Sequence, residues 1–180
     1  MATPQEILHF WFQELDAQKR FAKSDELDQT IRDRFLQTYK DVVNDKTASW
    51  RTTPEGRLAE IIVLDQFSRN MFRDTAKAFS SDGLALELAE AAVAVGDDQK
   101  LPAEQRAFIY MPYMHSESRA VHETAVTLFS QKGLEYNLNY EMMHKKIIDR
   151  FGRYPHRNAL LGRISTPEET AFLKEPGSSF

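Results

Sequence analysis

The stretch TPEGRLAEIIVLDQF, residues 53–67, predicts the centre of the fold. Thr53 followed by Pro54 is a typical helix N-terminus, because proline at the first helical position lacks an N–H that would otherwise need a partner. Beyond Leu58 the stretch is apolar almost all round, with four successive apolar residues from Ile61 to Leu64. A helix without a polar face is typical of a fully buried position. We therefore expect a central helix around which the rest of the chain packs.

Helix signals of the same kind recur on both sides of this stretch. Thr3-Pro4 has a glutamate three residues after the threonine, which is the capping-box pattern of a helix N-terminus, and Thr166-Pro167 repeats the cap-plus-proline start. After Ser24, apolar residues recur at intervals of three or four, as a half-buried helix requires. Further helices are expected over residues 84–95, 102–111, from Ser116 or Ser118 to 133, over 138–151, and from Thr166 to a point before Pro176.

No segment shows the alternation of apolar and polar residues that is typical of a strand. No fixed repeat period and no linker divides the chain. The sequence therefore predicts an all-α fold of about eight helices, in a single domain over residues 1–180.

Composition excludes several classes of function. The net charge of −4 argues against a general nucleic-acid binder, and the absence of cysteine excludes thiolate zinc sites and cysteine nucleophiles. The N-terminus has no secretory signal pattern, and no apolar run approaches the length of a membrane-spanning helix. The glycine-rich phosphate and dinucleotide motifs and the serine-hydrolase elbow are also absent. We expect a cytoplasmic protein with no cofactor and no membrane or nucleic-acid partner.

The segment HKKIIDRFGRYPHRNALLGR, residues 144–163, is a basic island in an acidic chain. It carries a charge of +5, whereas the other 160 residues carry −9. Arginines outnumber lysines four to two, which favours bidentate binding of a carboxylate or phosphate. The alternative is that these arginines pair with acidic residues of other helices and hold the last third of the chain in place.

The turn inside this island is stiff as well as polar. Gly152 is suited to end a helix in the left-handed region, and Pro155 restricts the residue before it to extended geometry. His156, Arg157 and Asn158 then present three polar groups from one short segment, and His156 titrates near neutrality. The alternative for Asn158 is a helix cap.

Two further polar clusters stand out. In LDQFSRNMFR, residues 64–73, Asp65 leaves an apolar helix, so it needs a buried partner such as an arginine of this segment or of the basic island. A single internal Asp–Arg bridge is the simpler interpretation. In MPYMHSE, residues 111–117, His115 and Glu117 precede a helix. With His122 or His144 they would offer metal ligands, but the pattern is far below motif strength and we expect no metal site.

Read together, these clusters resemble the bacterial family DUF924, whose function is unknown. The resemblance covers nearly the whole chain and rests on HFWF (9–12), LDQFSRNMFR (64–73), AFSSD (78–82), YMPYMHSE (110–117) and FGRYPHRNALLGRISTPEETAFL (151–173). It implies a fold similar to tetratricopeptide (TPR) repeats, a right-handed stack of antiparallel helix pairs. It also implies which positions the family keeps: Asp65, Gln66, Arg69, Asn70, Arg73, His115, Ser116, Glu117, His144, Gly152, Arg153, Pro155, His156, Arg157, Asn158, Gly162 and Arg163.

Two positions depart from the family pattern. Ser68 stands where relatives usually have proline, which predicts a less rigid turn at this point. His122 stands where relatives often have glutamine, which argues against His122 as an essential ligand.

Two functions are consistent with these residues. The first is a helical module whose groove binds a small anionic molecule or an acidic peptide. Its candidate ligand-binding residues are Asp65, Arg69, Asn70, Arg73, His144, Arg153, His156, Arg157, Asn158 and Arg163. The second is a hydrolase or lyase on a small phosphorylated or carboxylated substrate, with His115 and His156 as acid and base and Glu117 orienting one of them. A third interpretation is that all these polar groups only stabilise the fold. The sequence predicts no oligomeric state.

Overall fold

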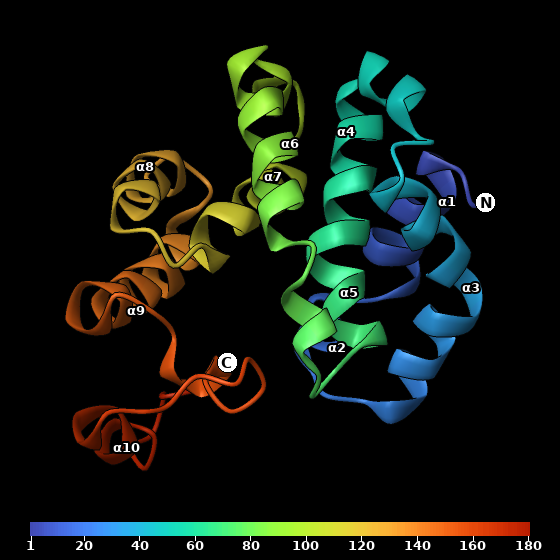
Figure 1. Cartoon of the computed structure of the whole chain (residues 1–180). Coiled ribbons are helices and arrows are strands. Elements are labelled where there is room, and N and C mark those ends of the chain that lie inside the picture. The colour runs from blue at the N-terminus through green and yellow to red at the C-terminus, as the bar shows by residue number, and fades with distance from the viewer.

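The structure is a computed structural model that describes residues 1–180, and it is built from helices without strands, which confirms the all-α prediction (Figure 1). The α-helices are α1 (Pro4–His9), α2 (Ala17–Phe21), α3 (Asp25–Val43), α4 (Pro54–Ile61), α5 (Ser68–Met71), α6 (Asp82–Ala94), α7 (Ala103–His115), α8 (Arg119–Phe129), α9 (Glu135–Phe151) and α10 (Pro167–Phe172). Short 3-10 turns lie at η2 (Ala48–Thr52), η4 (Ala76–Phe79), η5 (Asp97–Lys100) and η6 (Pro155–Arg157), and π-helical segments at η1 (Phe10–Glu14) and η3 (Ile62–Phe67).

The helix ends form where the sequence signals predict them. Thr3 and Thr166 both complete capping boxes, and the hydroxyl of Thr53 accepts a hydrogen bond from the N–H of Gly56. Ser24 caps α3 in the same way. Gly152 ends α9 with φ of 72°, in the left-handed region that glycine adopts without strain.

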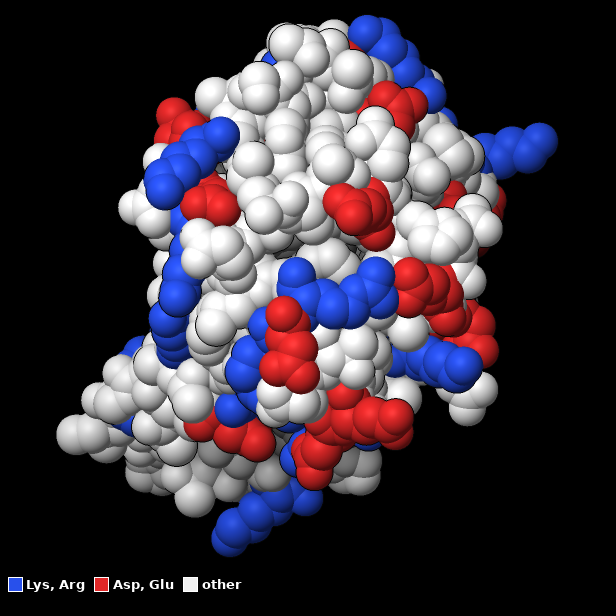
Figure 2. All heavy atoms as spheres, turned by 90° about the vertical axis from the view of Figure 1, so that its right-hand side faces the viewer, with Lys and Arg blue, Asp and Glu red and all other residues white.

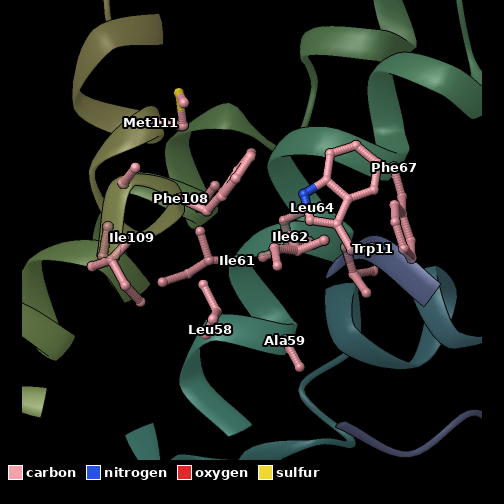
Figure 3. Packing of buried hydrophobic residues seen from close by; sticks show 14 of the residues in the cluster. Trp11, Leu58, Ala59, Ile61, Ile62, Leu64, Phe67, Phe108, Ile109 and Met111 are labelled. Carbon is pink, nitrogen blue, oxygen red and sulfur yellow. The ribbon is translucent and has the colours of Figure 1, made fainter. Parts of the chain in front are cut away.

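The predicted central helix forms as α4, η3 and α5 in one unbroken helical run. Every residue from Leu58 to Phe67 is buried. Figure 3 shows the side chains of this run between Trp11 on one side and Phe108 and Ile109 of α7 on the other. The Trp11 ring meets the Phe108 ring edge-on, with centroids 5.8 Å apart. This run and its neighbours form the main hydrophobic core of the chain.

Helices that follow one another in sequence also pack against one another. Contacts join α6 to α7, α7 to α8, and α8 to α9, while α4 contacts both α6 and α7. In Figure 1, α6 and α7 therefore separate α1–α5 from α8–α10, and the C-terminal end of the chain lies between these two groups. This sequential packing is compatible with the stack of helix pairs that the resemblance implies.

Three details differ from the sequence expectations. Helix α7 continues past Pro112 to His115, although proline removes one helical hydrogen bond. Every residue of α7 from position 107 to 114 is buried, and that packing outweighs the local cost. Helix α9 begins at Glu135, before the predicted start at residue 138. The sequence did not indicate this start, because the exposed first turn carries no apolar stripe. Helix α8 begins after Ser118, one of its two predicted caps, but ends at Phe129 and not at residue 133.

Ser68 lies inside the central helical run and not in a turn. Its side chain is fully buried, and its hydroxyl donates a hydrogen bond to the carbonyl of Leu64 at 2.5 Å. The expectation of a less rigid turn at Ser68 is therefore wrong, because the apolar surroundings keep this segment helical.

Charged side chains on the surface are of both signs. Figure 2 shows Lys and Arg interspersed with Asp and Glu on the face that carries α1 and α3. Ion pairs such as Arg34 with Glu14, at 2.7 Å, and Arg51 with Asp45, at 2.6 Å, account for part of this pattern. None of the helices has the length and hydrophobicity needed to cross a membrane.

Candidate functional site

A cavity of about 350 Å³ lies where the central helical run, α7, α9 and the η6 turn meet. Its wall combines aromatic side chains with histidines and arginines. The lining residues are Phe21, Gln66, Arg69, Phe79, Met111, Met114, His115, Tyr136, Asn137, Tyr140, His144, His156, Arg157 and Phe180. A second hollow of about 420 Å³ shares Phe79, His115 and Arg157 with it, so these three side chains separate the two spaces.

Asp65 and His115 form a buried pair at one side of the cavity. The Nδ1 atom of His115 lies 2.6 Å from Oδ1 of Asp65, and Asp65 is fully buried. Burial alone would raise the pKa of Asp65, but His115 and Arg69 lower it below its usual value. Burial and Arg69 in turn lower the pKa of His115, and Asp65 offsets this only in part. The carboxylate is therefore ionised and accepts the Nδ1–H hydrogen bond of a neutral imidazole.

Arg69 is the cation next to this pair, and a carboxylate of α6 holds it. Both of its terminal nitrogens donate to Asp82, at 2.8 and 3.0 Å, and Nη1 also lies 3.6 Å from Asp65. The simpler interpretation of Asp65, one Asp–Arg bridge, thus describes only part of its surroundings. His115 is the closer partner.

Arg157 is nearly buried, at 5% exposure, but no carboxylate holds it closely. Its Nη2 donates to the backbone carbonyl of His115 at 3.0 Å, while Nη1 lies 3.8 Å from Asp82. Its Nε is buried without a hydrogen-bond partner. The guanidinium lies between the rings of Phe79 and Tyr154, 4.6 and 4.7 Å from their centroids. Burial, and then repulsion from Arg69, lowers the pKa of Arg157, so the site disfavours its charge.

His144 and His156 line the same cavity as neutral imidazoles. Burial lowers the pKa of His144 to about 3, and burial together with Arg157 lowers that of His156 to about 4. Nδ1 of His144 donates to the carbonyl of Tyr140 at 2.7 Å, which leaves its Nε2 as an acceptor. Nδ1 of His156 is buried without a partner. The ring of Phe180 packs against both, with centroids 3.8 and 4.6 Å away.

The remaining candidate arginines lie in internal ion pairs and do not line the cavity. The closest N–O distances are 2.6 Å from Arg73 to Asp28, 2.7 Å from Arg153 to Glu169, and 2.8 Å from Arg163 to Glu117. The two candidate asparagines belong to the same networks. Asn70 donates to Asp28, and Asn158 donates to Glu169 and accepts from Arg163.

Glu117 is turned toward the chain turn after α9 and does not contact the His115 ring. It binds Arg163 through both oxygens and accepts the backbone N–H of Tyr154 at 2.6 Å. The residue that orients His115 is Asp65. No group of three or more His, Asp or Glu side chains is arranged to hold a metal ion.

His122 is fully buried in a separate network. Its Nδ1 lies 2.5 Å from Glu141, its Nε2 donates to the carbonyl of Ser116 at 2.6 Å, and Tyr154 contacts it through the hydroxyl. Burial raises the pKa of Glu141. Both ring nitrogens of His122 are therefore occupied within the protein.

Several site residues were not singled out from the sequence. Phe79 and Asp82 lie in the AFSSD stretch, so the motif itself contained their signal. Glu141 and the aromatic residues Phe21, Tyr136, Tyr140 and Phe180 carried no signal, because only the fold brings them to this region.

The comparisons with known proteins agree with this fold. The family described as "Bacterial protein of unknown function (DUF924)" matches residues 7–177. The solved structure of the protein of unknown function ATU0120 from Agrobacterium tumefaciens is similar, with 35% sequence identity and a TM-score of 0.91. That similarity covers 95% of this chain and 96% of the other. No curated protein matches the chain. The chain belongs to the DUF924 family of bacterial proteins of unknown function.

Proposed function

We propose that the protein binds a small organic anion in the 350 Å³ cavity, with Arg157 as the anion-binding residue. The observation that carries this proposal is that the Arg157 guanidinium is buried without a close carboxylate. Each of the other candidate arginines has a carboxylate oxygen within 2.8 Å, whereas the Arg157 contact is 3.8 Å long. A buried cation without a close anion is costly unless a ligand supplies one, and Nη1 of Arg157 has no hydrogen-bond partner within the protein.

The shape and lining of the cavity favour a small molecule over a peptide. A volume near 350 Å³ is at the lower end of small-molecule sites. Phe21, Tyr136 and Phe180 line it although each is more than half exposed, so they lie toward its opening. Exposed aromatic side chains around a polar interior suit a ligand with a flat ring and one anionic group. An acidic peptide would instead need the concave face of the helix stack. We also propose that the protein is cytoplasmic.

Titration calorimetry with benzoate, an aromatic monoanion, tests this function. We expect benzoate to bind the native protein and to bind Arg157→Gln roughly tenfold to hundredfold more weakly, the loss of one charge-assisted hydrogen bond. Arg150→Gln is the matched control, because it removes the same charge from an exposed arginine paired with Glu168. Equal affinity of the native protein and Arg157→Gln, or no benzoate binding at all, would contradict the proposal. Binding of an acidic peptide but not of benzoate would favour the concave face.

A further inference from the structure

His115 presents a free basic nitrogen to the cavity. Because Nδ1–H donates to the ionised Asp65 at 2.6 Å, the tautomer is fixed and the lone pair is on Nε2. No protein group hydrogen-bonds to Nε2. The ring lines the cavity, so that lone pair is available to a bound molecule or to water. A carboxylate behind a histidine, with the far nitrogen open, is the arrangement of a general base.

The charges around His115 keep it ready to accept a proton. The groups that face it from each packed element are Asp65 of η3, Arg69 of α5, Asp82 of α6, His144 of α9 and Arg157 of η6. Two cations and two carboxylates offset one another, and the lowered pKa of His115 leaves its imidazole neutral at physiological pH. The carboxylate of Asp65 stabilises the imidazolium once a proton is taken up.

The cavity lining contains no Ser, Thr, Cys, Lys, Asp or Glu. Its tyrosines and histidines are the only lining side chains able to form a covalent intermediate, and none of them is hydrogen-bonded to Nε2 of His115. Water is therefore the nucleophile that the base activates, and the chemistry that it supports is hydrolysis by direct attack of water.

The position of Arg157 selects the substrate class. Its Nη2 bonds the backbone carbonyl of His115 at 3.0 Å, and both residues line the cavity. A carboxylate bound to Arg157 places the remainder of the molecule beside the imidazole. The aromatic residues at the opening accommodate a ring at the other end of the molecule.

We propose that His115 is the general base of a carboxylesterase activity on small esters that carry a free carboxylate. Nε2 takes a proton from water while the water oxygen forms a bond to the ester carbonyl carbon. The tetrahedral intermediate then breaks its bond to the alcohol oxygen, and that oxygen takes the proton from Nε2 as the alcohol leaves. One water is consumed, one acid and one alcohol are formed, and His115 returns to its neutral state. This inference rests on the proposed function, because Arg157 supplies the carboxylate site.

Hydrolysis of the mono-4-nitrophenyl ester of terephthalic acid tests the proposal, since 4-nitrophenolate release is measured directly and the para carboxylate cannot reach its own ester carbonyl. The neutral ester 4-nitrophenyl benzoate is the comparison substrate. We expect the anionic ester to be hydrolysed at least about tenfold faster, and His115→Gln to lose about a hundredfold or more of that rate. His9→Gln is the control for hydrolysis by any surface imidazole, because the side chain of His9 is 65% exposed in α1, and its rate is expected to equal that of the native protein.

Two measurements on the native protein support the variant data. Benzoate is expected to inhibit hydrolysis competitively, because it occupies the carboxylate site. The rate, corrected for hydroxide, is expected to be level at pH 7 and above, and any fall on acidification is expected only below the ordinary histidine pKa near 6.5, since burial and Arg69 lower the pKa of His115.

The outcomes separate this inference from the proposed function. If benzoate binds but the anionic ester is not hydrolysed, the esterase proposal is overturned and the anion-binding proposal is unaffected. The same holds if benzoate binds and the native protein and His115→Gln hydrolyse the ester at equal rates. Absence of benzoate binding removes the anion site and the inference with it. If His115→Gln does not fold, a rate that is insensitive to benzoate, or that already falls between pH 8 and pH 7, overturns the proposal.

Discussion

His115 and Asp65 stand fifty residues apart in the chain, and their side chains meet at 2.6 Å beside the cavity that Arg157 lines. The contact joins α7 to the central helical run, so the most buried part of the fold orients the candidate base. Asp65 also lies 3.6 Å from Arg69, which ties the same carboxylate to the cation of α5.

Replacement of Asp65 by Asn is expected to lower the pKa of His115 further. The Asp65 carboxylate raises that pKa against the opposing effects of burial and Arg69, and the amide removes its charge. NMR titration of the His115 ring in the native protein and in Asp65→Asn measures the change. A His115 pKa that is unchanged or higher in the variant would show that the carboxylate does not act on the ring.

The pair Glu117–Arg163 is expected to stabilise the turn after α9. Both side chains are about a quarter exposed, the contact is bidentate, and Arg163 also holds Asn158 and the carbonyl of Tyr154. We expect Arg163→Ala to lower the free energy of unfolding by about 2–3 kcal/mol, because it leaves Glu117 partly buried without its cation. A double-mutant cycle with Glu117→Gln, followed by urea denaturation, measures the coupling. Additive effects of the two substitutions would contradict a direct interaction.

Acid is expected to destabilise the protein in the range where the buried histidines resist protonation. The pKa values of His144 and His156 are about 3 and about 4 in the folded state, below the ordinary value near 6.5 that the unfolded chain has. Between these limits the unfolded state binds more protons, so stability falls as the pH falls. From pH 6 to pH 5 each of the two contributes roughly 1 kcal/mol of that loss.

Urea denaturation at the two pH values tests this expectation in His156→Gln. The pH-dependent loss of stability is expected to shrink by the contribution of one histidine, whereas the exposed His9→Gln control keeps the loss of the native protein. An unchanged slope in His156→Gln would mean that His156 is protonated as readily in the folded state as in the unfolded chain.

Local signals in the sequence predict most of the fold. Threonine caps before proline, the apolar run at Ile61–Leu64 and Gly152 all act within a few residues, so their consequences are visible without the tertiary structure. The course of α7 through Pro112 could not be predicted, because burial in the core outweighs the local cost of proline. The first turn of α9 has no apolar pattern to mark it.

The candidate site could be predicted only in part, since its pairings join distant segments. The sequence indicates that Asp65 needs a partner, but whether this is an arginine or His115 depends on where α7 lies. Arg153, Arg157 and Arg163 look alike in the basic island. In the folded chain Arg153 pairs with Glu169 and Arg163 pairs with Glu117, whereas Arg157 has no close carboxylate. Phe180 reaches the cavity only through the path of the chain after α10.

A crystal structure of the protein with benzoate tests the central claim, anion binding by Arg157, most directly. The account predicts a carboxylate oxygen about 2.9 Å from Nη1 of Arg157, the usual length of a charge-assisted hydrogen bond. The benzoate ring is expected to lie toward Tyr136 and Phe180. Benzoate found only at surface cations, with the cavity unoccupied at concentrations that saturate the protein in solution, would contradict the account.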